Sequence, residues 1–371
     1  MDNPFRYGQV VDGEHFCPRP ALQKQLESFI RAGQNAVVTG ERRMGKTSLV
    51  LAAAGRVRGL RTLYADLLGI RSAADFCRRV AAGAGRLERG DSLLRKTCRL
   101  LSRLRPTVTF DRESGVPVLS VDARSSDPEE SVEAVFDMIE AHGRSMKLCV
   151  VFDEFQDVLR MENHEPLVAL MRSRIQFMGD VPFLFTGSVR NDMVQLFRDS
   201  RSPFFKAALP FEVGAIPDGE FVPFLAAKFA AGGRKADESF LRRVLDEAGR
   251  TTGDVQELCE ALWQVTDRGR TLDRSDIERA FILLHSREGT EYERSVSLLT
   301  GLQLRVLAAV ARIGGTSVQS AEFVREAGAS SAAAAKKAVL RLVALDLLFC
   351  HDGEYKFTNP FFRHWVLKKS L

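Results

Sequence analysis

The sequence has no long hydrophobic run and no recognisable export signal. None of its apolar stretches approaches the roughly 20 residues that a membrane-spanning helix needs. Its first four residues, Met-Asp-Asn-Pro, lack the basic start and the apolar core of a signal peptide. These absences argue against a helical membrane protein, and we expect the protein to be cytoplasmic, with no membrane partner.

Patterns for metal binding by thiolates and for disulfides are missing as well. The six cysteines lie far apart, no two of them form a Cys-x2-Cys pair, and the six histidines show no ligand spacing. A thiolate metal site is therefore not expected, and neither are disulfides in a reducing cytosol. Cys149 lies within an apolar run, so we interpret it as a small buried hydrophobic residue.

One loop carries the strongest signal in the chain. Residues 40–47 have the spacing Gly-x4-Gly-Lys-Thr, and they lie between a β-branched run and a good helix former. The glycines permit a tight turn in which backbone N–H groups and the helix N-terminus converge on phosphate oxygens. The loop therefore predicts nucleotide binding by Gly40, Glu41, Arg42, Arg43, Met44, Gly45, Lys46, Thr47 and Ser48.

Two side chains of this phosphate loop have specific expected roles. Lys46 would reach the β- and γ-phosphates, and the Thr47 hydroxyl would be a ligand of Mg²⁺, which prefers oxygen ligands. The chain contains no Asn-Lys-x-Asp motif for reading guanine, and this absence favours adenine weakly.

A second hydrophobic run ends in two carboxylates. Residues 148–152 are apolar in succession, as in a central parallel strand, and Asp153 and Glu154 follow at the carboxyl end. The pattern resembles a Walker B strand. We expect Asp153 to hold Mg²⁺ and Glu154 to orient and polarise the attacking water, so that Glu154 and Lys46 are the predicted catalytic residues.

A third apolar run, residues 181–185, is followed by hydroxyl groups. Thr186 and Ser188 could sense the γ-phosphate, with Ser188 the preferred sensor, or could instead cap the next helix. Arg190, Arg198 and Arg201 come next, and each is a candidate to complete a neighbouring subunit's site or to be an ordinary surface residue.

Together these motifs resemble the archaeal-type ATPases, a prokaryotic group within the AAA+/STAND P-loop NTPases. The matching residues span most of the first 205 positions. They are Asn3-Pro4-Phe5, Tyr7-Gly8, Phe16, Arg19, the Arg-Arg-x-Gly-Lys-Thr-Ser-Leu form of residues 42–49, Phe152-Asp-Glu-Phe-Gln156, Gly187-Ser188 and Ser202-Pro-Phe-Phe205. Two positions depart from the family pattern, since Leu22 replaces an acidic residue and Val255 replaces a proline.

The resemblance implies the fold class and the cofactors. It implies an α/β P-loop AAA+ core with a parallel sheet, followed by a helical lid and a C-terminal winged helix-turn-helix domain. It also implies ATP as the nucleotide and Mg²⁺ as its metal ion.

The hydrophobic pattern divides the chain into three regions. Residues 1–205 alternate short strands and helices and form the expected ATPase core, which includes a β-hairpin within residues 107–121. Residues 206–294 show helical spacing and form the expected lid. Residues 295–371 predict three helices and a β-wing, with a hydrophobic close at residues 360–365.

Charge bears on the partner of the winged helix. Residues 295–371 contain ten Lys or Arg and five Asp or Glu, which accounts for the whole net charge of +5. A basic excess of this kind fits nucleic-acid binding, with Lys336, Lys337 and Arg341 as phosphate contacts. Alternatively, the alanine-rich start of the same helix packs on the ATPase core and the lysines face solvent.

Our expectation is an ATP-binding switch protein with slow Mg²⁺-dependent ATP hydrolysis, whose partner is another protein or a second copy of itself. The alternative is a DNA-binding ATPase that resembles replication-origin initiators and uses the winged helix on duplex DNA.

Overall fold

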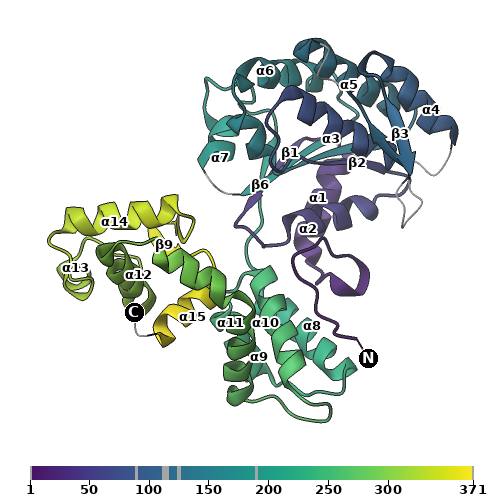
Figure 1. The fold of residues 1–371 in the computed structure, drawn as a ribbon. Coiled ribbons are helices and arrows are strands. Elements are labelled where there is room, and N and C mark those ends of the chain that lie inside the picture. Colours follow the sequence, from purple (N-terminus) through teal and green to yellow (C-terminus); the bar gives the residue numbers. More distant parts are fainter. Residues whose placement is uncertain (1, 88–90, 111–116, 123–126, 189–190, 370–371) are drawn as a thin grey trace. The chain divides into compact units, whose positions relative to one another are not determined.

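The computed structural model describes residues 2–87, 91–110, 117–122, 127–188 and 191–369 (Figure 1). The chain forms two compact units. The α/β unit comprises Val10–Ala215 and contains the phosphate loop. The helical unit combines the first nine residues with the chain from Ile216 onward, so both ends of the sequence belong to it.

A five-stranded parallel sheet forms the centre of the α/β unit. Its strand order is β2-β5-β6-β1-β7, and every pair of neighbours is parallel. Because β6 alone separates β1 from β5, the carboxyl ends of these three strands meet along one edge of the sheet. The strands are β1 (Ala36–Gly40), β2 (Arg61–Asp66), β5 (Leu148–Asp153), β6 (Phe183–Ser188) and β7 (Leu209–Glu212).

Helices cover both faces of this sheet. The α-helices of the unit are α1 (Pro20–Arg31), α2 (Lys46–Gly55), α3 (Ala73–Gly85), α4 (Asp91–Leu100), α5 (Pro128–Gly143), α6 (His164–Ile175) and α7 (Asn191–Arg198). The 3₁₀ helices are η1 (Gly13–His15), η2 (Ser102–Leu104) and η3 (Phe155–Arg160). This alternation of strands and helices confirms the α/β class predicted from the sequence.

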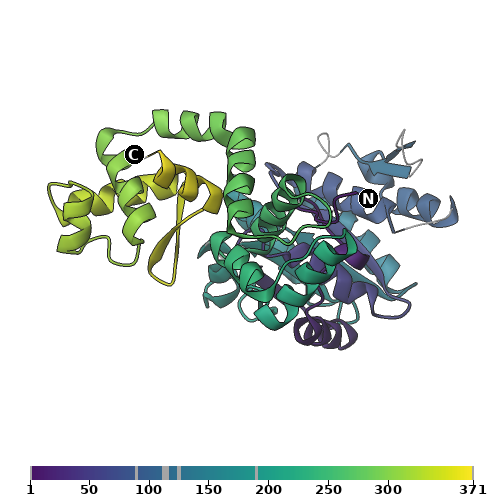
Figure 2. The same cartoon turned by 90° about the horizontal axis from the view of Figure 1, so that it is seen from below.

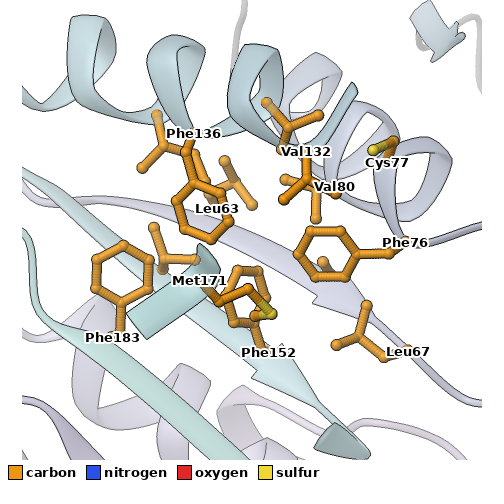
Figure 3. Packing of buried hydrophobic residues seen from close by; sticks show 14 of the residues in the cluster. Leu63, Leu67, Phe76, Cys77, Val80, Val132, Phe136, Phe152, Met171 and Phe183 are labelled. Carbon is orange, nitrogen blue, oxygen red and sulfur yellow. The ribbon is translucent and has the colours of Figure 1, made fainter. Parts of the chain in front are cut away.

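The larger core cluster of the α/β unit is rich in phenylalanine and includes residues of the sheet and of helices α3 and α5 (Figure 3). Phe152 and Phe183 on the strands pack against Phe76 and Phe136 on the helices, with ring centroids 5.6 Å apart for Phe76 and Phe152. The opposite face of the sheet is covered by α1 and α2, which bury Leu26, Ile30, Leu49 and Val50 against strand residues. With both faces covered, all six residues of β5 are buried, as its continuous apolar run requires.

An insertion follows α3 between β2 and α5. It contains α4, η2 and an antiparallel pair of strands, β3 (Thr107–Phe110) and β4 (Pro117–Ser120), in which Thr107 is opposite Ser120. These strands confirm the two arms of the expected hairpin, whose residues 111–116 lie outside the described part of the chain.

A buried hydrogen bond fixes α4 on α5. The Thr97 hydroxyl lies 3.0 Å from Nε2 of His142, and both side chains are completely buried. Burial lowers the pKa of His142 to about 4, so the imidazole is neutral at neutral pH. The bond therefore joins two uncharged groups.

Four helices form the first part of the helical unit: α8 (Asp218–Ala231), α9 (Glu238–Glu247), α10 (Thr252–Val265) and α11 (Arg274–Ser297). The N-terminal segment packs on them, since Phe5 is 2% exposed and its ring centroid lies 4.7 Å from that of Phe229. Lys228 also donates to the carbonyl of Pro4. Helix α11 runs without a break through residue 294, where the sequence pattern places the end of the lid.

The last part of the unit has the order of a winged helix. It comprises α12 (Gly301–Ile313), α13 (Ala321–Glu326), α14 (Ala332–Ala344), β8 (Leu348–His351), β9 (Glu354–Phe357) and α15 (Pro360–Lys368). Strands β8 and β9 form an antiparallel hairpin, which is yellow in Figure 2. Helix α15 packs on α11, where the rings of Phe281 and His364 stack 3.8 Å apart.

Among the described residues, no helix combines the length and the apolar character that crossing a bilayer requires.

The neutral His142 gives stability a predictable pH dependence. Below its ordinary pKa of 6.5, the unfolded chain binds a proton that the folded protein does not bind until about pH 4, so the free energy of unfolding falls in this window. Between pH 7.5 and about pH 5, we expect the wild type to lose about 2 kcal/mol more than His142→Gln. Urea unfolding measures this difference, and His15→Gln is the control. Equal losses in His142→Gln and the wild type would contradict the assignment.

Candidate nucleotide-binding site

The phosphate loop joins the end of β1 to the start of α2. Gly40 ends β1 at a close approach of two backbones, since a Cβ at this position would lie 2.4 Å from the carbonyl oxygen of Val213. Gly45 has a left-handed conformation with φ of 79° and immediately precedes α2. Both glycines of the motif therefore occupy positions where a side chain is unfavourable.

Between the two glycines, the side chains of the loop differ in their burial. Met44 is buried in the core below the loop, whereas Arg42 and Arg43 are exposed. Arg43 has a left-handed backbone with φ of 63°, a conformation that costs a residue with a Cβ about 1 kcal/mol or more. Glu41 is partly buried and supplies a backbone carbonyl to the lysine of the motif.

Lys46 lies folded over this loop. Its ammonium donates hydrogen bonds to the carbonyls of Gly40 at 3.1 Å and Glu41 at 2.8 Å, and the side chain is 6% exposed. Burial lowers the pKa of Lys46, while the carboxylates of Glu154 and Asp153 oppose this shift. These carboxylates come from β5 and its following turn, so the fold brings the two sequence motifs together.

Asp153 is the centre of the polar contacts at the sheet edge. Its Oδ2 accepts hydrogen bonds from the hydroxyls of Thr47 and Tyr64, both at 2.8 Å. Its Oδ1 accepts from the hydroxyl of Thr186 and from the backbone N–H of Glu154. With four donors, this buried carboxylate has a fixed orientation.

Tyr64, whose hydroxyl binds Asp153, belongs to no motif that the sequence showed. Burial, followed by the charge of Asp153, raises its pKa, so its hydroxyl remains a donor at neutral pH. The available signal was a tyrosine in a strand that pairs directly with β5. Thr186 was a sensor candidate, and in the structure it binds the carboxylate of Asp153.

Glu154 lies where β5 ends and η3 begins. Its backbone is left-handed, with φ of 53°, a conformation seen disproportionately at functional sites. The side-chain amide of Gln156 donates a hydrogen bond to Oε2 of Glu154. Gln156 is 4% exposed, so it can hold the glutamate side chain in place.

The preferred sensor lies at the end of β6, and the three candidate arginines follow it in the chain. Ser188 is buried at the end of β6, opposite Gly40 in the register of the sheet. Arg201 pairs with Asp199 within its own turn, and Arg198 is exposed. Arg190 lies outside the described residues.

Arg19 connects the phosphate loop to the end of the α/β unit. Its guanidinium donates to the carbonyl of Met44 at 2.7 Å and to the carbonyl of Gly214 at 3.0 Å, and the residue is 3% exposed. In the sequence it was only a mark of the family resemblance. A buried arginine is costly unless its donors are satisfied, so these bonds explain why the charge is tolerated.

A second connection involves Ser48. Its hydroxyl accepts a hydrogen bond of 3.0 Å from the backbone N–H of Val11, close to the other end of the α/β unit. Ser48 follows Thr47 in the first turn of α2 and is 6% exposed. The predicted nucleotide-binding residue therefore has a structural partner in the N-terminal segment.

The oxygen atoms at this edge of the sheet are suitable ligands for a magnesium ion. The Thr47 hydroxyl and an Asp153 carboxylate oxygen lie 2.8 Å apart, and both are hard oxygen donors of the kind that Mg²⁺ prefers. Mg²⁺ typically keeps several waters and uses few protein ligands, which agrees with a site of two side chains.

Sequence families match two parts of the chain. Residues 30–190 match the AAA domain, and residues 290–368 match a probable winged helix domain. These matches agree with the resemblance to archaeal-type AAA+ ATPases, and the α/β unit has the parallel sheet that this resemblance implies. No curated protein matches the sequence.

Solved structures share this architecture at low sequence identity. A Walker-type ATPase of Pyrococcus abyssi is 17% identical with a TM-score of 0.63, and the alignment covers 96% of this chain and 97% of that one. The ORC2 protein of Aeropyrum pernix, solved in ADPNP-ADP complexes, is 12% identical with a TM-score of 0.56 and 99% coverage of both chains. The ORC1 protein of the same organism, solved with DNA, is 11% identical with a TM-score of 0.53, covering 96% and 94%.

Both departures from the family pattern are compatible with the packing of this chain. Leu22 packs against the core beneath α1 and α2, and Val255 is completely buried in α10. Each position therefore carries an apolar residue that makes apolar contacts.

The hydroxyl of Thr186 should matter for metal affinity through Asp153. Thr186→Val removes one donor from the buried side of this carboxylate while keeping the shape of the side chain. We expect the affinity for Mg²⁺ in the presence of ATP to fall about tenfold, the usual effect of losing a partner of a metal ligand. Titration of Mg²⁺ with a fluorescent ATP analogue measures it, with Thr62→Val as the control. Unchanged affinity would show that Thr186 does not orient Asp153.

Proposed function

We propose that this protein is an ATP-binding switch with slow ATP hydrolysis. The observation that carries the proposal is that both chain connections between the two units are hydrogen-bonded to the phosphate loop or its helix. One connection follows Gln9, and Val11 binds Ser48 there. The other precedes Ile216, and Gly214 is joined to Met44 through Arg19.

Nucleotide binding would act on both connections at once. Phosphates bound by the loop would accept hydrogen bonds from the backbone N–H groups of residues 41–47, so the loop would adopt a single conformation. Since Met44 and Ser48 lie in or beside this loop, its ordering would fix Gly214 and Val11 as well. Release of the γ-phosphate would loosen the same contacts, which is how a nucleotide switch changes the arrangement of its parts.

The hydrolytic step would depend on two residues of the site. Glu154 would orient and polarise the attacking water, and its backbone geometry and its bond to Gln156 support this role. Lys46 would turn from the loop carbonyls to the β- and γ-phosphates. Mg²⁺, held by Thr47 and Asp153, would supply charge neutralisation for the phosphates.

Duplex DNA as the partner of the winged helix receives less support from its side chains. The ammonium of Lys336 donates to the hydroxyl of Tyr355 and lies 4.6 Å from the centre of its ring, so this lysine already has a partner within the domain. Lys337 and Arg341 are exposed, with the half-exposed Leu340 beside them. ATP turnover with and without DNA separates the two alternatives.

We expect Glu154→Gln to reduce ATP turnover at least about a hundredfold while leaving Mg²⁺-ATP affinity nearly unchanged, because a general base acts on the chemical step. The exposed Glu162→Gln is the matched control. Turnover and mass in solution are measured with and without duplex DNA, and a switch protein should hydrolyse ATP slowly in both cases.

Two results would contradict this account. DNA-stimulated turnover that disappears in Glu154→Gln would favour the initiator-like alternative. Mg²⁺-ATP affinity that survives Lys46→Ala would show that the loop is not the nucleotide site.

Arg19→Met tests the coupling itself. In the wild type, Mg²⁺-ATP should slow amide hydrogen exchange both in residues 40–48 and in residues 213–216. In Arg19→Met the protection should remain in the loop and disappear from residues 213–216, because the hydrogen bonds from Arg19 to Met44 and Gly214 are gone. Arg31→Met, at the exposed C-terminal end of α1, the helix that Arg19 precedes, is the control. Protection of residues 213–216 in Arg19→Met would overturn the coupling role.

A further inference from the structure

Helix α4 and the following η2 have one buried face and one basic face. Thr97, Leu101 and Leu104 are buried with at most 1% exposure, so this face points into the α/β unit. Arg95, Arg99 and Arg103 recur at intervals of four residues, and all three are exposed. We call these three residues the arginine stripe.

Within the described residues, the stripe is a concentration of positive charge. Residues 91–110 contain five basic residues and one acidic residue, Asp91, although the chain as a whole is close to balanced. None of the three stripe arginines forms a hydrogen bond or ion pair with any residue that the structure describes. Some other arginines of the same unit, such as those at positions 78, 144 and 160, are paired with carboxylates three or four residues away.

The stripe is also held in place. The bond between Thr97 and His142 fixes the rotation of α4 about its axis, and Lys96 donates to the hydroxyl of Ser145 at 3.2 Å. Both partners belong to α5 or to the residues that follow it. Arg95 and Arg99 therefore start from a backbone that is held in place, which lowers the entropy lost on binding an anion.

We propose that the arginine stripe binds the phosphate backbone of nucleic acid. Arg95 and Arg99 lie on α4, where four residues rise about 6 Å, close to the roughly 7 Å axial distance between every second phosphate of a duplex strand, and Arg103 follows in η2. Arginine is suited to this role because its planar guanidinium binds phosphate through two N–H groups. The proposal is confined to contacts with phosphates, which carry no sequence information.

This proposal does not rest on the ATP switch. It concerns a surface on the insertion between β2 and α5, whereas the site above lies at the carboxyl ends of β1, β5 and β6. It also differs from binding through the winged helix, which belongs to the other unit. Nucleotide-free protein and Lys46→Ala should therefore bind nucleic acid equally well.

The test uses the full chain and a fluorescent duplex of mixed sequence, with anisotropy measured over a series of salt concentrations. The variant Arg95→Gln/Arg99→Gln/Arg103→Gln should weaken binding at low salt at least about tenfold and reduce the slope of log affinity against log salt by up to about 3. Arg58→Gln/Arg61→Gln/Arg71→Gln removes the same charge from exposed positions of the same unit and should have a much smaller effect. Circular dichroism and Mg²⁺-ATP affinity check that the variants are folded.

Two further measurements identify the surface and the ligand. Lys337→Gln/Arg341→Gln should leave most of the affinity intact, and loss of binding in this variant alone would assign the duplex to the winged helix and overturn the proposal. Polyglutamate should compete less well than duplex of equal charge, and equal competition would mean a surface for acidic protein. Absence of duplex binding by the wild type at low salt would also overturn it.

Discussion

The buried guanidinium of Arg19 is the interaction on which the account of this protein depends. It joins the carbonyl of Met44, within the phosphate loop, to the carbonyl of Gly214, where the chain leaves the α/β unit. Removing it would leave two carbonyls without their partner, at a cost of about 1–3 kcal/mol each where they are buried. In the proposed switch, the same bonds would transmit a change in the loop to the connection with the helical unit.

Asp153 organises the chemistry in a similar way. Residues from α2, β2 and β6 all donate to its carboxylate, so one buried side chain sets the mutual positions of three elements. This arrangement follows from the strand order, because β5 lies between β2 and β6 and its carboxyl end is next to both. The sheet topology thus brings together the oxygen atoms of Thr47 and Asp153 that we propose as ligands of Mg²⁺.

The sequence predicted the parts whose signals are local. Spacing and periodicity predicted the phosphate loop, the strand before Asp153, and the order of helices and strands in the winged helix. The contacts of Tyr64 and Arg19 could not be predicted in this way. Tyr64 binds Asp153, and Arg19 binds Gly214, and in each pair the two residues are more than 80 positions apart in the sequence. The continuity of α11 through residue 294 was also missed, since a hydrophobic pattern can change its buried face without ending a helix.

The most direct test of the switch is a distance between the two units, measured with and without Mg²⁺-ATP. Nitroxide labels on the exposed Cys350 and on an introduced cysteine, Arg58→Cys, report it by pulsed electron paramagnetic resonance, with Cys98→Ser to avoid a third label. Our account predicts that Mg²⁺-ATP shifts or narrows the distance distribution in the otherwise wild-type protein and leaves it unchanged when Lys46→Ala is added. An identical distribution with and without bound ATP would contradict the claim that the phosphate loop controls the connections between the units.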